Sequence, residues 1–199
     1  MLKQRLKKIV TVAYDILGNK IANESIIVHN EASLQLQFGM ILKTLGQLYE
    51  YAPTDRLVVM LETPKNVTTT KSTNGKARCD IEIMLSDGNG NQCIAYIELK
   101  YLKKDKNAAI TDERFSVWAD IENVEHYIDS SDKLGFVIVY TDNVNHTLVK
   151  NTKFCIGTGA EIHADTYPYT QGRIITIKSN YTPNWDTYNP NHNLLKIEI

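Results

Sequence analysis

Two stretches in the first fifty residues repeat apolar side chains at helical spacing. The first contains Leu2, Leu6, Ile9, Ala13 and Ile16. The second contains Leu34, Phe38, Ile41, Leu45 and Leu48. Because residues three or four apart lie on the same face of an α-helix, the pattern predicts two amphipathic helices. We expect the first to end at Gly18-Asn19 and the second to cover roughly residues 30–50.

The next part of the chain has the pattern of β-strands. Arg56 to Thr63 reads as a strand that Pro64 should end, and two further apolar-polar alternations cover Ala77–Ser86 and Gln92–Tyr101. Between those two lies Asp87-Gly88-Asn89-Gly90, a strong turn sequence. The pattern therefore predicts a β-hairpin formed by the second and third strands.

A helix and a buried strand follow the hairpin. Thr111 to Ser130 places aromatic and aliphatic side chains on one side, and Leu134–Tyr140 is continuously apolar, which is typical of a strand covered on both faces. Further strands are expected at Arg173–Lys178 and Leu194–Ile199. The order predicts an α/β protein whose central mixed sheet is flanked by helices. We expect a core over residues 1–142 and a β-leaning extension, 143–199, packed on the same domain.

The composition supports a single globular unit. The chain has 199 residues, 43% of them apolar, with a net charge of −1 and a pI near 6.5. These values exclude a disordered chain and exclude binding of nucleic acid by bulk charge alone. Three cysteines without a Cys-x-x-Cys pair exclude a disulfide framework and a zinc ribbon, and no apolar run is long enough for a membrane span. We expect a soluble, cytoplasmic protein with reduced thiols.

Charge is unevenly distributed along the chain. Residues 64–106 carry eight Lys or Arg and five acids, whereas 107–142 carry eight acids and two bases. We interpret the acidic block as the solvated outer face of the predicted helix. The basic, Thr-rich run 64–76 has no apolar periodicity and predicts a long loop.

The predicted hairpin brings carboxylates together. If its turn is centred on Asn89, opposed residue numbers sum to 178, which places Asp80 opposite Glu98. Alternation then puts Arg78, Asp80, Glu82, Tyr96, Glu98 and Lys100 on one face, which we expect to carry the chemistry, and aliphatic residues on the other, which we expect to be core. Like charges directly opposed on a sheet are destabilising unless a cation lies between them. The spacing therefore predicts a divalent cation site. Glu82 shares this face, and we expect it to have a structural role, with metal ligation as the alternative.

Lys100 lies two residues beyond Glu98 on the same face. Carboxylate oxygens from separate strands are how proteins that act on phosphates usually hold Mg²⁺, for which Mn²⁺ is an expected substitute. A lysine beside them can orient an attacking water or neutralise charge that develops on phosphorus. The five histidines show no metal-ligand spacing.

These residues resemble the PD-(D/E)XK nuclease superfamily, which has the restriction-endonuclease-like fold. The likeness covers roughly residues 30–142 and consists of Asp80, then Glu98-Leu99-Lys100, then a helix and a strand. Glu31, with Gln35 one turn later, matches a helical Glu that such nucleases often add. Asn123 and Tyr127 match only in part the Gln-x-x-x-Tyr of some branches, and Cys79 replaces the Pro of the family name.

The resemblance implies a role for each residue. Asp80, Glu98 and the Leu99 carbonyl would bind the catalytic metal, Lys100 would serve the nucleophile, and Glu31 with Gln35 would tune the site or bind a second ion. Two residues of the resemblance could instead have a purely structural role. Glu31 could simply favour the helix start beside an Asn30 N-cap, and Tyr127 could be a core residue.

Basic residues flank the predicted site: Lys65, Lys71, Lys76, Arg78, Lys103 and Lys104. They are candidate phosphate contacts, and ordinary solubility is the alternative for any one of them. Beyond residue 143 the tyrosines and Trp185 could read or stack bases, or simply pack.

We therefore expect a Mg²⁺-dependent endonuclease that hydrolyses phosphodiester bonds of DNA. The alternatives are a nuclease of the same fold that acts on RNA or branched DNA, and a non-catalytic nucleic-acid-binding or assembly subunit. A double-strand cutter of this size is expected to form a two-fold homodimer.

Overall fold

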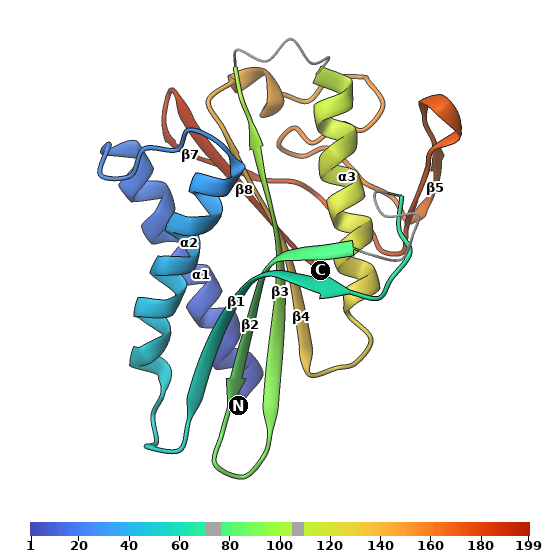
Figure 1. The fold of residues 1–199 in the computed structure, drawn as a ribbon. Helices are drawn as coiled ribbons and strands as arrows, with labels where there is room; N and C mark the ends of the chain where they lie inside the picture. The colour runs from blue at the N-terminus through green and yellow to red at the C-terminus, as the bar shows by residue number, and fades with distance from the viewer. Residues whose placement is uncertain (71–76, 105–109) are drawn as a thin grey trace.

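The computed structural model describes residues 1–70, 77–104 and 110–199, and it has helices on both sides of a six-stranded sheet (Figure 1). The helices are α1 (Leu2–Ala22), α2 (Glu31–Gly46) and α3 (Ile110–Tyr127), with short 3₁₀ turns at Gln47–Tyr49, Val144–His146 and Thr170–Gly172. The strands are β1 (Arg56–Lys65), β2 (Ala77–Ser86), β3 (Gln92–Leu102), β4 (Lys133–Thr141), β5 (Asp165–Pro168), β6 (Ile174–Ile177), β7 (Trp185–Asn189) and β8 (His192–Glu198). This confirms the predicted class, a mixed α/β protein with a central mixed sheet flanked by helices.

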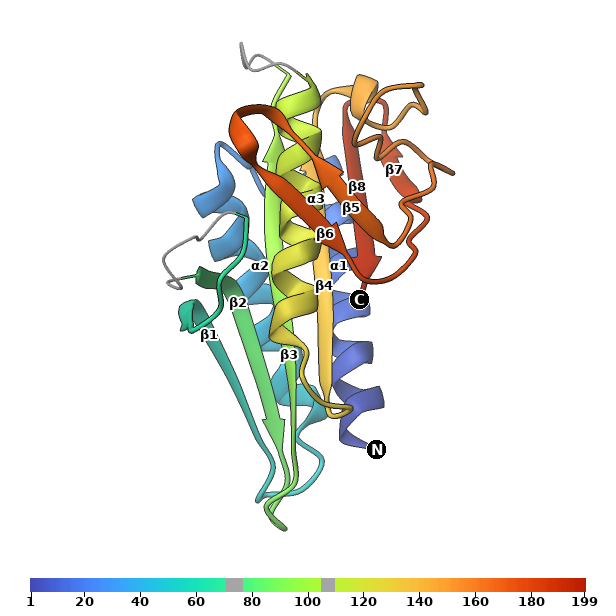
Figure 2. The same ribbon diagram turned by 90° about the vertical axis from the view of Figure 1, so that its right-hand side faces the viewer.

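The strand order in the main sheet is β1-β2-β3-β4-β8-β7. The first three strands form an antiparallel meander, and α3 then connects β3 to the parallel strand β4. From the C-terminal extension, β8 pairs antiparallel with β4, and β7 pairs with β8. The separate β5–β6 hairpin lies across the outer side of α3 (Figure 2). The extension therefore contributes to both the sheet and its covering layer.

Each face of the sheet has its own apolar core. The helices α1 and α2 pack against one face, which carries Ile81, Ile83 and Ile97, whereas α3 packs against the other, which carries Tyr96 and Val139. Burial on both faces explains why β4 is continuously apolar. It also means that the hairpin face predicted to carry only chemistry is itself largely buried: Glu82 and Glu98 are 7% and 4% exposed.

Two element ends differ from the sequence prediction. The helix α1 continues past Gly18-Asn19 to Ala22. Gly18 does not end the helix; it makes room for another element, since a Cβ there would come within 2.1 Å of the Tyr188 ring. The strand β1 includes Pro64, which pairs with Arg78. A proline fits because β1 is an edge strand, where one side of the backbone needs no ladder partner.

The acidic residues of α3 are not a solvated face, so that prediction is wrong. Glu122 accepts hydrogen bonds from the backbone N–H groups of Thr70 and Thr176, at 2.9 and 2.8 Å. Glu125 accepts from the backbone of Lys178 and from neighbouring groups. Both carboxylates are buried because they satisfy backbone donors of the segments that pack on α3.

Cys79, Cys93 and Cys155 are free thiols, as expected; Cys79 and Cys93 are buried and Cys155 is half-buried. Within residues 1–70, 77–104 and 110–199, no helix combines the length and apolar character needed to cross a bilayer.

Candidate active site

The start of α2 places two of the predicted site residues. Asn30 is the N-cap, and its side chain accepts a hydrogen bond from the Ser33 N–H at 2.8 Å in a capping box. The cap fixes the first turn, which carries Glu31, and the next turn carries Gln35. The Gln35 amide donates to the Asp80 carbonyl at 2.6 Å and to the Glu62 carboxylate at 3.0 Å. The helix therefore presents Gln35 to β2 at Asp80 and Glu31 to Lys100 of β3.

The pairing of β2 with β3 changes at Asp80. From Ser86–Gln92 to Ile81–Ile97 the paired residue numbers sum to 178, as predicted, but the ladder ends there. The carboxylate of Asp80 accepts the Leu99 N–H at 2.7 Å and so takes the place of a backbone partner. The adjacent edge strand bends at the same level, where Glu62 has a φ of 53°. The predicted Asp80–Glu98 pair is therefore not part of the regular ladder.

Cys79 shows why simple alternation fails at this position. It is buried in the core under α3, whereas Ile81 is buried under α1 and α2. Residues two apart on a regular strand share a face, so the strand must be irregular between them. The irregularity brings the Asp80 carboxylate to the peptide between Glu98 and Leu99.

Lys100 contacts two carboxylates, and the charge of a third, Asp80, also acts on it. Its Nζ is 3.0 Å from both oxygens of Glu31 and 3.7 Å from Oδ2 of Asp120. The Glu31 side chain is 44% exposed, that of Lys100 16%, and that of Asp120 1%. The cluster of Glu31, Asp80, Lys100 and Asp120, hereafter the carboxylate–lysine cluster, therefore extends from solvent into the interior.

The electrostatics of the cluster show mutual perturbation. The pKa of Asp80 is raised to about 6, chiefly by burial, and the negative charges of Asp120 and Glu31 contribute to the rise. The hydrogen bond from the Leu99 N–H and the charge of Lys100 partly offset it. Burial alone would lower the pKa of Lys100, but Asp120 and Glu31 outweigh it and hold that pKa above its usual value. Lys100 is therefore a fixed cation at neutral pH, and Asp80 is a carboxylate that is costly to ionise.

Glu98 is held on the inner side, toward α3. The Tyr127 hydroxyl donates to its Oε1 at 3.0 Å, and Tyr127 is itself 4% exposed. Burial and the charge of Glu98 raise the pKa of Tyr127 far above its usual value, so it acts as a donor. Asn123, four residues earlier, is buried. Tyr127 is thus a core residue, as one reading predicted, that also orients a predicted ligand.

The structure brings together Glu31, Gln35, Asp80, the Leu99 peptide and Lys100, and it adds Asp120, which the sequence analysis missed. A signal was present: Asp120, Asn123 and Tyr127 are spaced i, i+3, i+7, so they share a helix face with the two residues that had been noticed. The assumption that acids on this helix face solvent concealed it.

The predicted phosphate contacts differ in their surroundings. Lys65 forms an ion pair with Glu82 and lies over the Tyr96 ring, 4.4 Å from its centroid, which gives Glu82 the structural role expected of it. Arg78 and Lys104 are exposed, and Lys103 is half-buried just beyond Lys100. Lys71 and Lys76 lie outside the described residues. Arg78, Lys103 and Lys104 are thus the basic side chains open to a partner near the site.

The donor chemistry of the cluster suits a hard divalent cation. Glu31, Asp80, Asp120 and Glu98 offer carboxylate oxygens, and the raised pKa of Asp80 reflects carboxylates crowded where solvent is scarce. In the part of the chain that the structure describes, no three His, Cys, Asp or Glu side chains are arranged as a metal site. Lys100 forms ion pairs with two of these carboxylates, Glu31 and Asp120.

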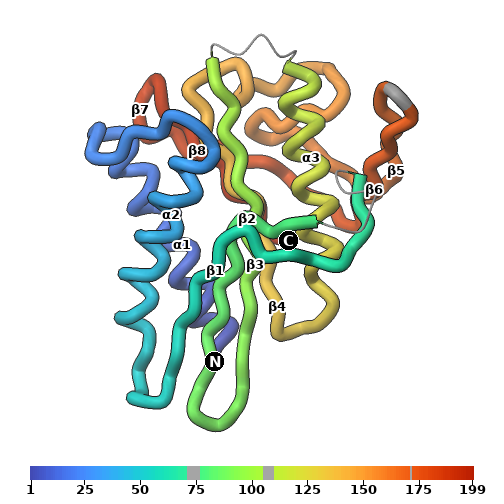
Figure 3. The backbone as a smooth tube through the Cα atoms, viewed as in Figure 1, coloured from blue at the N-terminus to red at the C-terminus, as the bar shows by residue number. Residues whose placement is uncertain are grey.

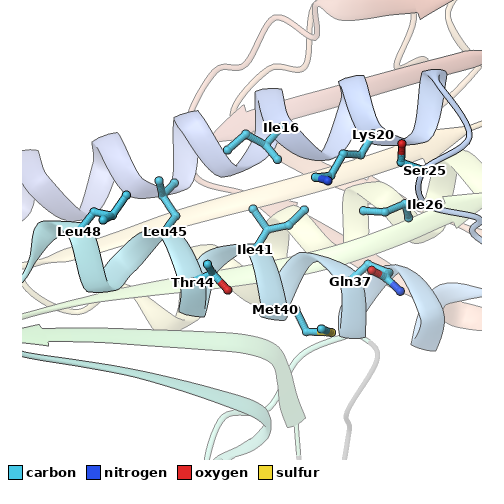
Figure 4. Close-up of a pocket in the computed structure, with 10 residues that line it drawn as sticks. All are labelled: Ile16, Lys20, Ser25, Ile26, Gln37, Met40, Ile41, Thr44, Leu45 and Leu48. Carbon is cyan, nitrogen blue, oxygen red and sulfur yellow. The ribbon is translucent and has the colours of Figure 1, made fainter.

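A groove elsewhere on the molecule is chemically different. It has a volume of about 470 Å³ and lies between α1 and α2 (Figure 4). It is lined by Ile16, Lys20, Ser25, Ile26, Gln37, Met40, Ile41, Thr44, Leu45 and Leu48. Without a carboxylate in its lining, this groove is no candidate for metal-dependent chemistry.

No protein-family model matches this chain, and neither a curated protein nor a solved structure does. The residues of the cluster and their geometry are therefore the observations from which a function can be inferred.

Proposed function

We propose that this protein is a metal-dependent nuclease that hydrolyses phosphodiester bonds of DNA, of the restriction-endonuclease type. The observation that carries the proposal is the position of Lys100. Its ammonium lies 3.0 Å from Glu31, and its charge couples to Asp80. Glu31 lies on α2, Asp80 on β2 and Lys100 on β3, so that Lys100 is 69 residues from Glu31 and 20 from Asp80 in the sequence. The resemblance requires these residue types in one place.

The topology supports the same proposal. A helix, an antiparallel three-stranded meander, a crossover helix and a parallel fourth strand are what a restriction-endonuclease-like core would need. The distortion at Asp80 adds to this support, because it turns a carboxylate toward the Glu98-Leu99 peptide. Backbone irregularities that redirect a side chain are frequent next to active sites.

The residues divide the work as follows. Asp80 and Glu98, with the Leu99 carbonyl and Glu31, would hold Mg²⁺ or Mn²⁺, and the buried Asp120 adds negative charge. The bound ion would supply Lewis-acid stabilisation of the phosphate and an activated water. Lys100, a permanent cation, would stabilise negative charge on the phosphate oxygens as the bond to phosphorus forms. Gln35 would keep the Asp80 backbone in place through its 2.6 Å bond.

DNA is the partner we propose, with Arg78, Lys103 and Lys104 as phosphate contacts around the site, and the cytoplasm as its location. RNA or branched DNA is the alternative substrate, because the same site would hydrolyse its phosphodiester bonds by the same chemistry. A non-catalytic binding or assembly subunit is the alternative from another class; an intact set of Asp80, Glu98 and Lys100 favours the enzyme. For cleavage of both strands we propose a two-fold homodimer, which would place one such site on each strand.

The direct test is incubation of the purified protein with supercoiled plasmid, linear duplex, single-stranded DNA and RNA, in Mg²⁺, Mn²⁺ or EDTA. We expect metal-dependent cleavage of DNA. Lys100→Ala should abolish cleavage while binding in Ca²⁺ persists, because the lysine acts on the reacting phosphate. Lys7→Ala is the matched control, since Lys7 forms an exposed ion pair with Glu198 on the surface. Cleavage by Lys100→Ala at the wild-type rate would refute the proposal, as would no cleavage of any substrate.

A further inference from the structure

The outward side of α2 is apolar, and no element within residues 1–70, 77–104 and 110–199 covers it (Figure 1). Leu36, Met40 and Thr44 are exposed and four residues apart, so they form a ridge along the helix. Leu36 is 53% exposed and Met40 is 57% exposed, and Leu48, just beyond the helix, is 74% exposed. Isolated exposed apolar residues are ordinary, but a continuous row of them marks an interaction surface.

An apolar groove lies on each side of this ridge. The groove between α1 and α2, of about 470 Å³, is bordered by Met40 and Thr44 (Figure 4). A second groove, of about 380 Å³, lies between α2 and the edge strand β1, and the same two residues border it. Val59 and Leu61 of β1 also line this second groove. Helices pack by fitting the ridge of one into a groove of the other, and this surface has both.

The sequence of α2 lacks the charges that a solvent-facing helix normally carries. Residues 32–49 contain a single charged side chain, Lys43, whose ammonium donates to the Leu57 carbonyl of β1 at 3.3 Å. The neighbouring helix α1 follows the usual pattern, with Lys8 and Asp15 among the residues on its exposed side. Charged residues are depleted at the centre of protein interfaces. The outward side of α2 therefore has the composition of an interface and not of a solvated surface.

These features favour a second copy of the same chain as the partner. A two-fold axis places one surface against itself, so the surface needs both a ridge and a groove, and it must carry few charges of one sign. Lys20 and Lys43 are the charged residues that line the two grooves, and neither lies on the ridge. The contact would therefore depend on apolar packing and not on ion pairs.

The size of the surface is also sufficient for a dimer. From Ala32 to Leu48 the helix is about 24 Å long, and the ridge with its two grooves is about 20 Å wide, since packed elements lie about 8–10 Å apart. Two copies would together bury about 1,000 Å², which is at the lower limit for a specific interface. A dimer of this size should dissociate reversibly on dilution.

We infer that the outward side of α2 forms a two-fold homodimer, with the ridge of each copy in a groove of the other and Met40 near the axis. Met40 has this place because it borders both grooves. Glu31 is the first residue of α2, so each copy's carboxylate–lysine cluster would lie at the end of the interface. The role of this dimer in cutting two strands rests on the proposed function, whereas the surface itself is argued without the cluster.

Sedimentation equilibrium in EDTA, without nucleic acid, tests the dimer independently of cleavage. Between about 0.1 and about 100 μM protein, the mass should rise from 22.6 kDa toward twice that value. Met40→Glu should raise the dissociation constant at least about 100-fold, because two like charges would meet near the axis. Val149→Glu is the matched control, since Val149 is 59% exposed and lies outside α2, and it should not change the dissociation constant. Raising the salt concentration should not weaken the dimer.

Cross-linking tests the position of the axis. In a Cys155→Ser background the remaining cysteines, Cys79 and Cys93, are buried. Met40→Cys should then be joined into a covalent dimer by a short bifunctional maleimide, whereas Val149→Cys should not. This measurement also decides the matter if Met40→Glu does not fold.

A mass of 22.6 kDa at every concentration would overturn the inference, as would a dimer that Met40→Glu leaves intact or that salt weakens. A dimer that Met40→Glu dissociates, in a protein that cleaves no nucleic acid, would refute the proposed function and leave the surface assigned. Cleavage by a protein that is monomeric throughout would do the reverse. If both proposals hold, Met40→Glu should nick supercoiled plasmid where the wild type linearises it.

Discussion

Replacing Asp80 by asparagine removes one negative charge from the carboxylate–lysine cluster but keeps the size of the side chain and an acceptor for the Leu99 N–H. In the wild type, ionised Asp80 is opposed by burial and by the charges of Asp120 and Glu31. We therefore expect Asp80→Asn to be inactive as a nuclease and, in EDTA, more stable than wild type.

The magnitude follows from the pKa of Asp80. Its folded value is about 6 and its ordinary value is 3.8. At low pH Asp80 is protonated in both the folded and the unfolded protein, and its raised pKa has no effect on stability. As the pH rises from about 4 to about 6, the carboxyl ionises more readily in the unfolded protein, and the folded state loses stability. Above about pH 7 it reaches about 3 kcal/mol, at about 1.4 kcal/mol per unit. Asp80→Asn should gain most of this free energy of unfolding at pH 7.5 and only about 0.5 kcal/mol at pH 4.

Urea unfolding followed by circular dichroism at pH 4, 6 and 7.5, in EDTA, measures the gain as a difference between mutant and wild type. Asp132→Asn is the control, because Asp132 is an exposed residue whose pKa is lowered by its hydrogen bond to Ser130. It should show no such gain. If the Asp80→Asn difference were independent of pH, or if the mutant were less stable at pH 7.5, the account of Asp80 as a costly buried charge would be wrong.

Three further outcomes are expected. Millimolar Mg²⁺ or Mn²⁺ should raise the melting temperature of the wild type and change that of Asp80→Asn much less, because only the folded site binds the ion; equal shifts would mean that Asp80 is not a ligand. Alanine at both Lys71 and Lys76 should reduce the salt dependence of DNA binding by about 0.9 in slope per lost contact, and an unchanged slope would assign these two lysines to solubility. Lys65→Ala should instead lower the free energy of unfolding, because its buried carboxylate partner would be left unpaired. Glu122→Ala should lower the free energy of unfolding in urea by about 2–3 kcal/mol, because two backbone donors lose their acceptor; a change within 0.5 kcal/mol, roughly the usual size for a surface substitution, would restore the solvated-face interpretation.

Local patterns predicted most of the architecture. The hairpin Ala77–Ser86 and Gln92–Leu102 was located because a turn sequence and alternation agree there, and its register follows from turn length. The strands β5 and β7 were missed, since each is only four or five residues long and carries mostly polar or aromatic side chains. The glycine at residue 18 was read as a helix end, but it accommodates the ring of Tyr188, 170 residues later, which no local pattern contains.

The candidate site was predictable where it follows from strand and helix periodicity, and not where the backbone departs from them. Glu31, Gln35 and Lys100 lie near one another because a capped helix and a regular strand carry them. The position of Asp80 depends on a break in the pairing of β2 with β3, which the alternation of apolar and polar residues does not predict. The burial of Asp120 depends on the packing of α3 against the sheet, beside Lys100 of β3, so a charged residue in an acidic stretch gave a misleading impression of exposure.

Glu122 and Glu125 hold the C-terminal segments against α3, and the way they do so affects which substitutions these segments can accept during evolution. Apart from the Tyr181 hydroxyl, the donors that these carboxylates bind among the described residues are backbone N–H groups, which every residue except proline supplies. The outward side chains of β6 and of the neighbouring loop can therefore be exchanged without loosening the attachment to α3. Two carboxylates on one helix would allow the surface of β6 and the neighbouring loop to diversify while α3 and the sheet stayed fixed, and a designer could randomise that surface on the same anchor.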